Sequence, residues 1–115
     1  MPPSPWEVVV ATQREVVYET DDPSIRVRYR RSEPPRPYTY AVTVEAEIGK
    51  ELWTTVRLWD NADDVNEHHV HEYTRHGEKQ KPLIRGFESV NEAIATAISE
   101  ARENPSEIVR QWREP

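Results

Sequence analysis

The chain has 115 residues, of which 31% are charged and 36% hydrophobic, and its formal net charge at pH 7 is −6. This length predicts a single domain, residues 1–115, with one modest core. The absence of cysteine excludes disulfides, thiolate catalysis and zinc–thiolate sites. The acidic balance argues against binding nucleic acid through a broad basic face, and three glycines exclude Gly-rich nucleotide-binding loops.

The first half of the chain is patterned as strands. After a flexible, proline-rich start at residues 1–5, two β-branched clusters between Trp6 and Thr20 predict one bent strand or two shorter strands. Residues 25–30 alternate apolar side chains with arginines, as in a half-buried strand with a basic outer face. A second proline-rich stretch, residues 33–37, predicts a surface loop.

A hairpin is predicted around Gly49-Lys50, between strands at Tyr38–Ile48 and Glu51–Asp60. Strict alternation in the second strand predicts two faces, one with Leu52, Thr54, Val56 and Leu58, the other with Trp53, Thr55, Arg57 and Trp59. A further short strand is predicted from His69 to Arg75, with His69, His71 and Tyr73 on one face. Residues 82–87 are expected to approach the sheet again.

The pattern then changes to that of helices. Ser89-Val90-Asn91-Glu92 is a capping box, in which Ser89 bonds the Glu92 amide and Glu92 reaches back to the Ser89 amide. Asn104-Pro105 ends this helix and begins another, so residues 89–113 form a C-terminal helical part. Strands followed by helices predict an α+β fold, with an antiparallel sheet of about four to six strands covered by C-terminal helices.

The residues that suggest chemistry lie between Arg57 and His76, a stretch that contains all four histidines. His69 and His71 on one face of a strand suit a two-ligand grip on a metal, or an acid–base pair for RNA cleavage. We predict a catalytic group of His69, His71 and Asp60, in which Asp60 orients an imidazole. Arg57 is the predicted phosphate clamp, and the other predicted substrate-binding residues are Asn61, Tyr73 and Arg75.

This acid–base scheme requires no metal and no cofactor. Two other interpretations of the cluster remain open: a structural or interaction role for histidines in a polar segment, and adventitious metal affinity. Asp60-Asn61 is also a common turn signal, because both side chains bond their own backbone.

The segment resembles a known family. A strand ending in Arg57-Leu58-Trp59-Asp60-Asn61, followed by His69-Val70-His71, Gly77-Glu78-Lys79, Pro82 and Phe87-Glu88-Ser89-Val90, is similar to the TumE-like toxins of toxin–antitoxin pairs. The resemblance covers roughly residues 54–102. Trp59 stands where the family usually has Tyr, and the stretch from His71 to Phe87 is longer than usual. The resemblance implies a small cytoplasmic toxin that is neutralised by a helix-turn-helix antitoxin.

The predicted function is therefore a toxin that cleaves RNA through its histidine cluster, as a metal-independent endoribonuclease. One alternative is a non-catalytic module that binds a partner protein through its sheet face or its C-terminal helices. Another is a metal-dependent site. No apolar run approaches the roughly 20 residues that cross a bilayer, and no signal peptide is recognisable, so we expect a cytoplasmic protein without membrane contact. An exposed edge at Tyr38–Ile48 predicts pairing with a second copy as a homodimer.

Overall fold

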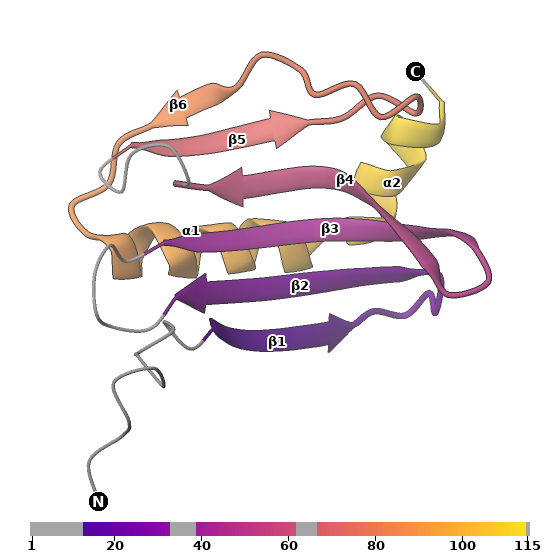
Figure 1. Cartoon of the computed structure of the whole chain (residues 1–115), viewed down its shortest axis with the longest axis horizontal. Helices are drawn as coiled ribbons and strands as arrows, with labels where there is room; N and C mark the ends of the chain where they lie inside the picture. The colour runs from indigo at the N-terminus through magenta and orange to yellow at the C-terminus, as the bar shows by residue number, and fades with distance from the viewer. Residues whose placement is uncertain (1–12, 33–38, 62–66, 115) are drawn as a thin grey trace, which may run out of the picture.

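The computed structural model describes residues 13–32, 39–61 and 67–114, and these residues form one antiparallel sheet followed by two helices (Figure 1). The strand order equals the chain order, so each strand pairs with the next. The predicted α+β class is thus confirmed. The six strands are β1 (Gln13–Glu19), β2 (Ile25–Ser32), β3 (Tyr40–Gly49), β4 (Leu52–Asp60), β5 (His68–Glu72) and β6 (Leu83–Arg85).

The predictions for residues 1–5, 33–37 and the strand before Gln13 lie outside the described residues. The hairpin around Gly49-Lys50 is confirmed as β3 and β4. Lys50 and Glu51 form the turn, and Glu51 has a φ of 60°, in the left-handed region.

The helices α1 (Val90–Glu103) and α2 (Pro105–Arg113) cover one face of the sheet and lie behind it in Figure 1. Ser89 caps α1 as predicted, because its Oγ accepts the Glu92 amide proton at 3.1 Å. The Glu92 carboxylate reaches back one residue further than predicted and accepts from the Glu88 amide at 3.3 Å. Asn104 caps α2 with Pro105 in the first turn.

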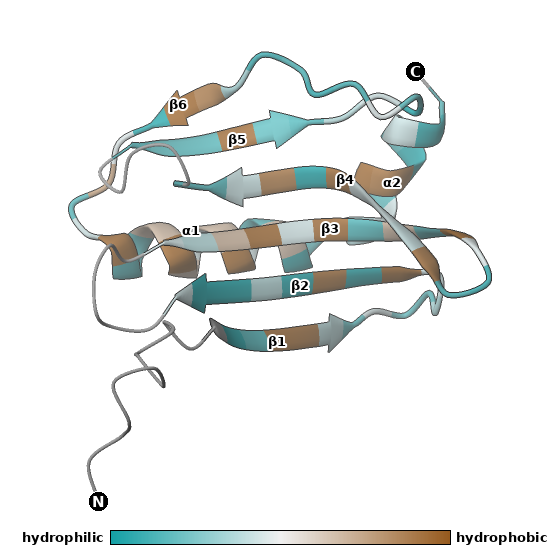
Figure 2. Ribbon diagram, viewed as in Figure 1, coloured by the Kyte–Doolittle hydropathy of each residue, from teal (hydrophilic) through white to brown (hydrophobic). Residues whose placement is uncertain are grey.

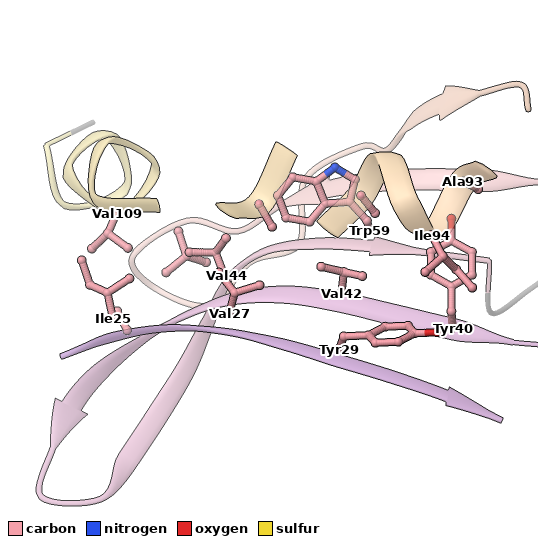
Figure 3. Close-up of a cluster of buried hydrophobic side chains, with 14 residues drawn as sticks. Ile25, Val27, Tyr29, Tyr40, Val42, Val44, Trp59, Ala93, Ile94 and Val109 are labelled. Carbon is pink, nitrogen blue, oxygen red and sulfur yellow. The ribbon is translucent and has the colours of Figure 1, made fainter. Parts of the chain in front are cut away.

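The core lies between β2, β3 and the helices (Figure 3). Hydrophobic and hydrophilic residues alternate along both strands (Figure 2), so one face of the sheet is apolar and packs under α1 and α2. Val27, Val42 and Val44 are fully buried there. The opposite face, called the open face below, carries Arg26, which pairs with Glu45 at 2.7 Å.

A β-bulge in β4 makes the predicted two-face pattern of that strand wrong. Val44 pairs with Arg57 and Glu45 pairs with Thr55, so Val56 is an extra residue that shifts the alternation by one. Trp59 therefore lies on the helix face, where its Nε1 donates to Glu100 at 3.3 Å. The sequence predicted Trp53 and Thr55 on the same face as Arg57 and Trp59. In the structure Arg57 and Trp59 lie on the helix face, whereas Trp53 and Thr55 lie on the open face.

The edges of the sheet are β1 and β6. Because β3 pairs with β2 on one side and β4 on the other, the prediction that the strand at Tyr38–Ile48 offers an edge to a second copy is wrong. The homodimer itself stays a prediction. In the described part of the chain, no helix is both long enough and apolar enough to cross a membrane.

Candidate functional site

Asp60, His69 and His71 come together on the open face, near the end of β4. The antiparallel register places Asp60 opposite His69 and Leu58 opposite His71. Directly opposed residues share a face of a sheet, and so do residues two apart along a strand. The register of one hairpin thus gathers all three side chains that were predicted as the catalytic group.

The three side chains converge on one small, buried volume. Asp60 Oδ1 lies 3.4 Å from His71 Nε2 and 3.8 Å from His69 Nδ1, and one ligand atom from each residue lies within 4.8 Å of the other two. The residues are only 7%, 7% and 6% exposed, for Asp60, His69 and His71 in that order. These separations exceed the roughly 2.7–3.2 Å of a protein hydrogen bond.

Glu67 orients the first imidazole. His69 Nε2 lies 2.8 Å from Glu67 Oε1, and a carboxylate accepts, so the Nε2 of a neutral ring carries the proton. The Nδ1 lone pair then faces Asp60. A carboxylate that holds the outer nitrogen of a ligating histidine is the usual second partner in metal sites. The sequence prediction missed Glu67, although its place two residues before His69 puts it on the same face.

Several polar atoms of the site lack a hydrogen-bond partner among the described residues. Asp60 Oδ1 and His69 Nδ1 are buried and have no hydrogen-bond partner among the described residues, which is costly for polar groups away from water. Burial lowers the pKa of His71, Lys79 lowers it further, and Asp60 acts in the opposite direction. His71 is therefore neutral at pH 7, so that a ring nitrogen can offer its lone pair.

The spacing matches the requirement of a small metal ion. Zinc holds imidazole nitrogen and carboxylate oxygen at about 2.0–2.2 Å in tetrahedral geometry, which separates two ligand atoms by about 3.3–3.5 Å. The distance of 3.4 Å from Asp60 to His71 fits without movement, and the 3.8 Å to His69 needs a shift of a few tenths of an ångström. Two imidazole nitrogens and a carboxylate oxygen, without a sulfur ligand, suit iron(II), cobalt and nickel as well as zinc.

The predicted substrate-binding residues do not join this group. Arg57, Tyr73 and Arg75 line a cavity under α2, on the helix side of the sheet. For Arg57 the cause is the alternation of the strand, because Arg57 and Asp60 are three residues apart on a regular stretch of β4 and so lie on opposite faces. Asn61 is fully buried, and its Oδ1 accepts the backbone amide proton of Tyr40 at 3.0 Å, an interaction that joins the end of β4 to β3.

The two remaining histidines lie apart from the site. His68 packs on the helix face, where its Nδ1 lies 2.9 Å from the Tyr40 hydroxyl and its ring meets the edge of Phe87. Burial raises the pKa of Tyr40 to about 12, so the hydroxyl beside His68 keeps its proton at pH 7. His76 is exposed in the turn after β5.

No family model matches this chain, and comparisons with curated proteins and with solved structures found no match. The resemblance to TumE-like toxins therefore stays a prediction.

Proposed function

We propose that this chain binds a divalent transition-metal ion, zinc foremost, through Asp60, His69 and His71. One observation carries the proposal. Three donor atoms from three side chains converge within 4.8 Å of one another in a buried site, and two of them have no hydrogen-bond partner among the described residues. A bound cation would satisfy the buried Asp60 carboxylate, whose Oδ1 has no hydrogen-bond partner among the described residues.

The three ligands that the described residues offer are the number found in catalytic zinc centres. Structural zinc sites use four protein ligands, whereas catalytic sites use three and keep a position for water or substrate. Zinc in such a position lowers the pKa of bound water to about 7, which supplies a nucleophile for hydrolysis. The described residues offer three ligands on one side of the ion, so we propose metal-assisted hydrolysis as the reaction class.

A second candidate function uses the same residues without metal. In the predicted toxin, His69 and His71 act as base and acid in RNA cleavage, and the observation that favours this scheme is the carboxylate of Asp60 beside both imidazoles. Arg57 cannot clamp a phosphate held by these imidazoles, because it lies on the opposite face of the sheet. The cytoplasmic address and the helix-turn-helix antitoxin partner belong to this second proposal.

Metal binding is tested by titrating tag-free, chelator-treated protein with zinc in a calorimeter. The wild type should bind one ion, and cobalt(II) should give the visible absorption of a low-symmetry site. The His69→Ala/His71→Ala variant should lose both signals, while His76→Ala, which removes an exposed histidine of the same hairpin, should keep them. Equal zinc binding by wild type and the double variant would overturn the proposal.

Growth and RNA cleavage separate the two candidate functions. Cells expressing the wild type, the double histidine variant and His76→Ala are compared, and purified proteins are incubated with RNA with and without chelator. Cleavage that survives complete metal removal supports the acid–base toxin. Cleavage that needs added zinc supports the metal-dependent hydrolase, and growth arrest by the double variant contradicts any role of the histidines in toxicity.

A further inference from the structure

A second site lies on the other side of the sheet from Asp60. Between the middle of β4, the segment that follows β5 and helix α2, the structure has a cavity of about 740 Å³. Figure 1 shows α2 beside the first half of β4 and near the end of β5. Pockets for small molecules usually measure about 300–1,000 Å³, so this cavity is large enough for a compact organic ligand.

The lining brings charged donors to the cavity. Arg57 and Arg75 both belong to it, and the Arg57 side chain is 23% exposed while Arg75 is exposed. Arg57 Nε and Trp112 Nε1 are buried without a hydrogen-bond partner among the described residues, and water does not reach them, so the other N–H groups of the two guanidinium groups are the donors that a ligand meets.

The charge of the lining specifies an anion. Arg57 and Arg75 contribute two positive charges and Glu72 one negative charge, which leaves one positive charge in a chain whose net charge is −6. Glu72 is well exposed and occupies only the Nη2 side of Arg57, at 2.8 Å. The Nη1 group of the guanidinium is left for an oxygen of the ligand, and guanidinium groups bind carboxylates and phosphates through their N–H groups.

The rest of the lining is apolar or aromatic. Val56, Ile108 and the ring of Trp112 line the same cavity. A pocket with a largely apolar wall and few convergent donors is the usual form of a small-molecule site. From these three observations we infer that the cavity under α2 binds a small aromatic anion, a planar ring that carries a phosphate or carboxylate, with the anion on Arg57 and the ring against Trp112.

The site is independent of the proposed metal centre, because the sheet separates them. Ligand binding to the cavity is therefore measured with chelator-treated protein. The compounds added are the four nucleoside 5′-monophosphates, the matching uncharged nucleosides, benzoate and inorganic phosphate. The indole N–H of Trp112 gives its own nuclear magnetic resonance signal, which Trp112→Phe identifies by its disappearance. Binding should move this signal and leave the indole signal of Trp53, on the open face, unchanged.

The expected result is saturable binding of at least one aromatic anion, with nucleosides and phosphate binding at least about tenfold more weakly. A monophosphate that binds while benzoate does not identifies the phosphate source, and the reverse identifies the carboxylate source. Trp112→Ala removes the ring from the lining and should weaken binding several-fold. Arg57→Gln should weaken it at least about tenfold, whereas Arg26→Gln, the matched change on the open face, should not.

Three results would overturn the inference: no movement of the Trp112 signal with any probe at millimolar concentration, unchanged affinity in Arg57→Gln, or binding of a monophosphate with the same affinity as its uncharged nucleoside. The His69→Ala/His71→Ala variant should bind the anion as the wild type does. Loss of metal binding and loss of anion binding can therefore be told apart.

Discussion

Replacement of Asp60 by Asn should make the metal-free protein more stable. The Asp60 side chain is 10% exposed, and its Oδ1 has no hydrogen-bond partner among the described residues. The nearest groups are the imidazoles of His69 and His71, and burial keeps His71 neutral. An unsatisfied buried group costs about 1–3 kcal/mol, and a charged one more. The amide of Asn removes the charge and can donate to His71.

We therefore expect Asp60→Asn to raise the free energy of unfolding of metal-free protein by about 1–3 kcal/mol. Zinc should reverse the order. At a free zinc concentration of 100 times the dissociation constant, binding stabilises the wild type by about 2.7 kcal/mol, whereas the variant gains almost nothing because it lacks the carboxylate ligand. Urea unfolding of tag-free protein, with chelator and with buffered zinc, measures both effects.

Asp22→Asn is the matched control. Its Oδ1 accepts from the Ser24 amide at 2.9 Å and from the Ser24 hydroxyl at 2.7 Å, and these bonds lower the pKa of Asp22. The charged form therefore stabilises the fold, and the same substitution should destabilise it. The reasoning about Asp60 is refuted if Asp60→Asn also destabilises the metal-free protein, since Asp60 would then be a structural group like Asp22.

Three further predictions follow from the contacts around the site and the helices. Burial lowers the pKa values of His68 and His71 below their ordinary 6.5, so the unfolded chain binds more protons than the folded protein below that pH. The free energy of unfolding should therefore be constant above about pH 7 and fall as the pH drops through about 6.5. An equal midpoint of urea unfolding at pH 7.5 and at pH 5.5 would contradict this prediction. Glu67→Gln should weaken zinc binding by about 10–100-fold without unfolding the protein, and unchanged affinity by calorimetry would remove Glu67 from the site. Ser89→Ala should lower stability by about 1 kcal/mol through loss of the α1 cap, measured by thermal unfolding against Ser99→Ala on the exposed side of the same helix.

The features of the fold that were predictable are those that depend on neighbouring residues. The α1 cap needs only Ser89 and the amide three residues later, and the β3–β4 hairpin needs only alternation around a short turn. The bulge at Val56 was not predictable in this way. It depends on which residue of β3 lies opposite each residue of β4, and the alternation of β4 itself gives no sign of a one-residue shift.

The candidate site, too, was predictable only where it depends on residues that are close in sequence. His69 and His71 share a face because they are two residues apart on one strand, so their pairing follows from the sequence. Asp60 joins them through the β4–β5 register, which the short loop between the strands makes a reasonable expectation. Arg57 was assigned to the same site because it is near in sequence, although its distance of three residues from Asp60 on one strand already puts it on the opposite face. Trp112 was not expected near Arg57, because nothing in the sequence brings α2 to the middle of β4.

Alternation along β4 explains why one hairpin can serve two chemically different sites. Arg57 and Asp60 are three residues apart on a stretch of β4 that pairs regularly with both neighbouring strands, so their side chains point to opposite faces. The Leu58–His71 pair lies on the open face and the adjacent Arg57–Glu72 pair on the helix face. A guanidinium close to a cation site would weaken metal binding. The place of Arg57 across the sheet leaves the carboxylate to the imidazoles and gives the cavity under α2 its positive charge. The bulge at Val56 decides which site lies under the helices: if β4 alternated regularly from Thr55 on the open face, Arg57 would lie on the open face and Asp60 on the helix face.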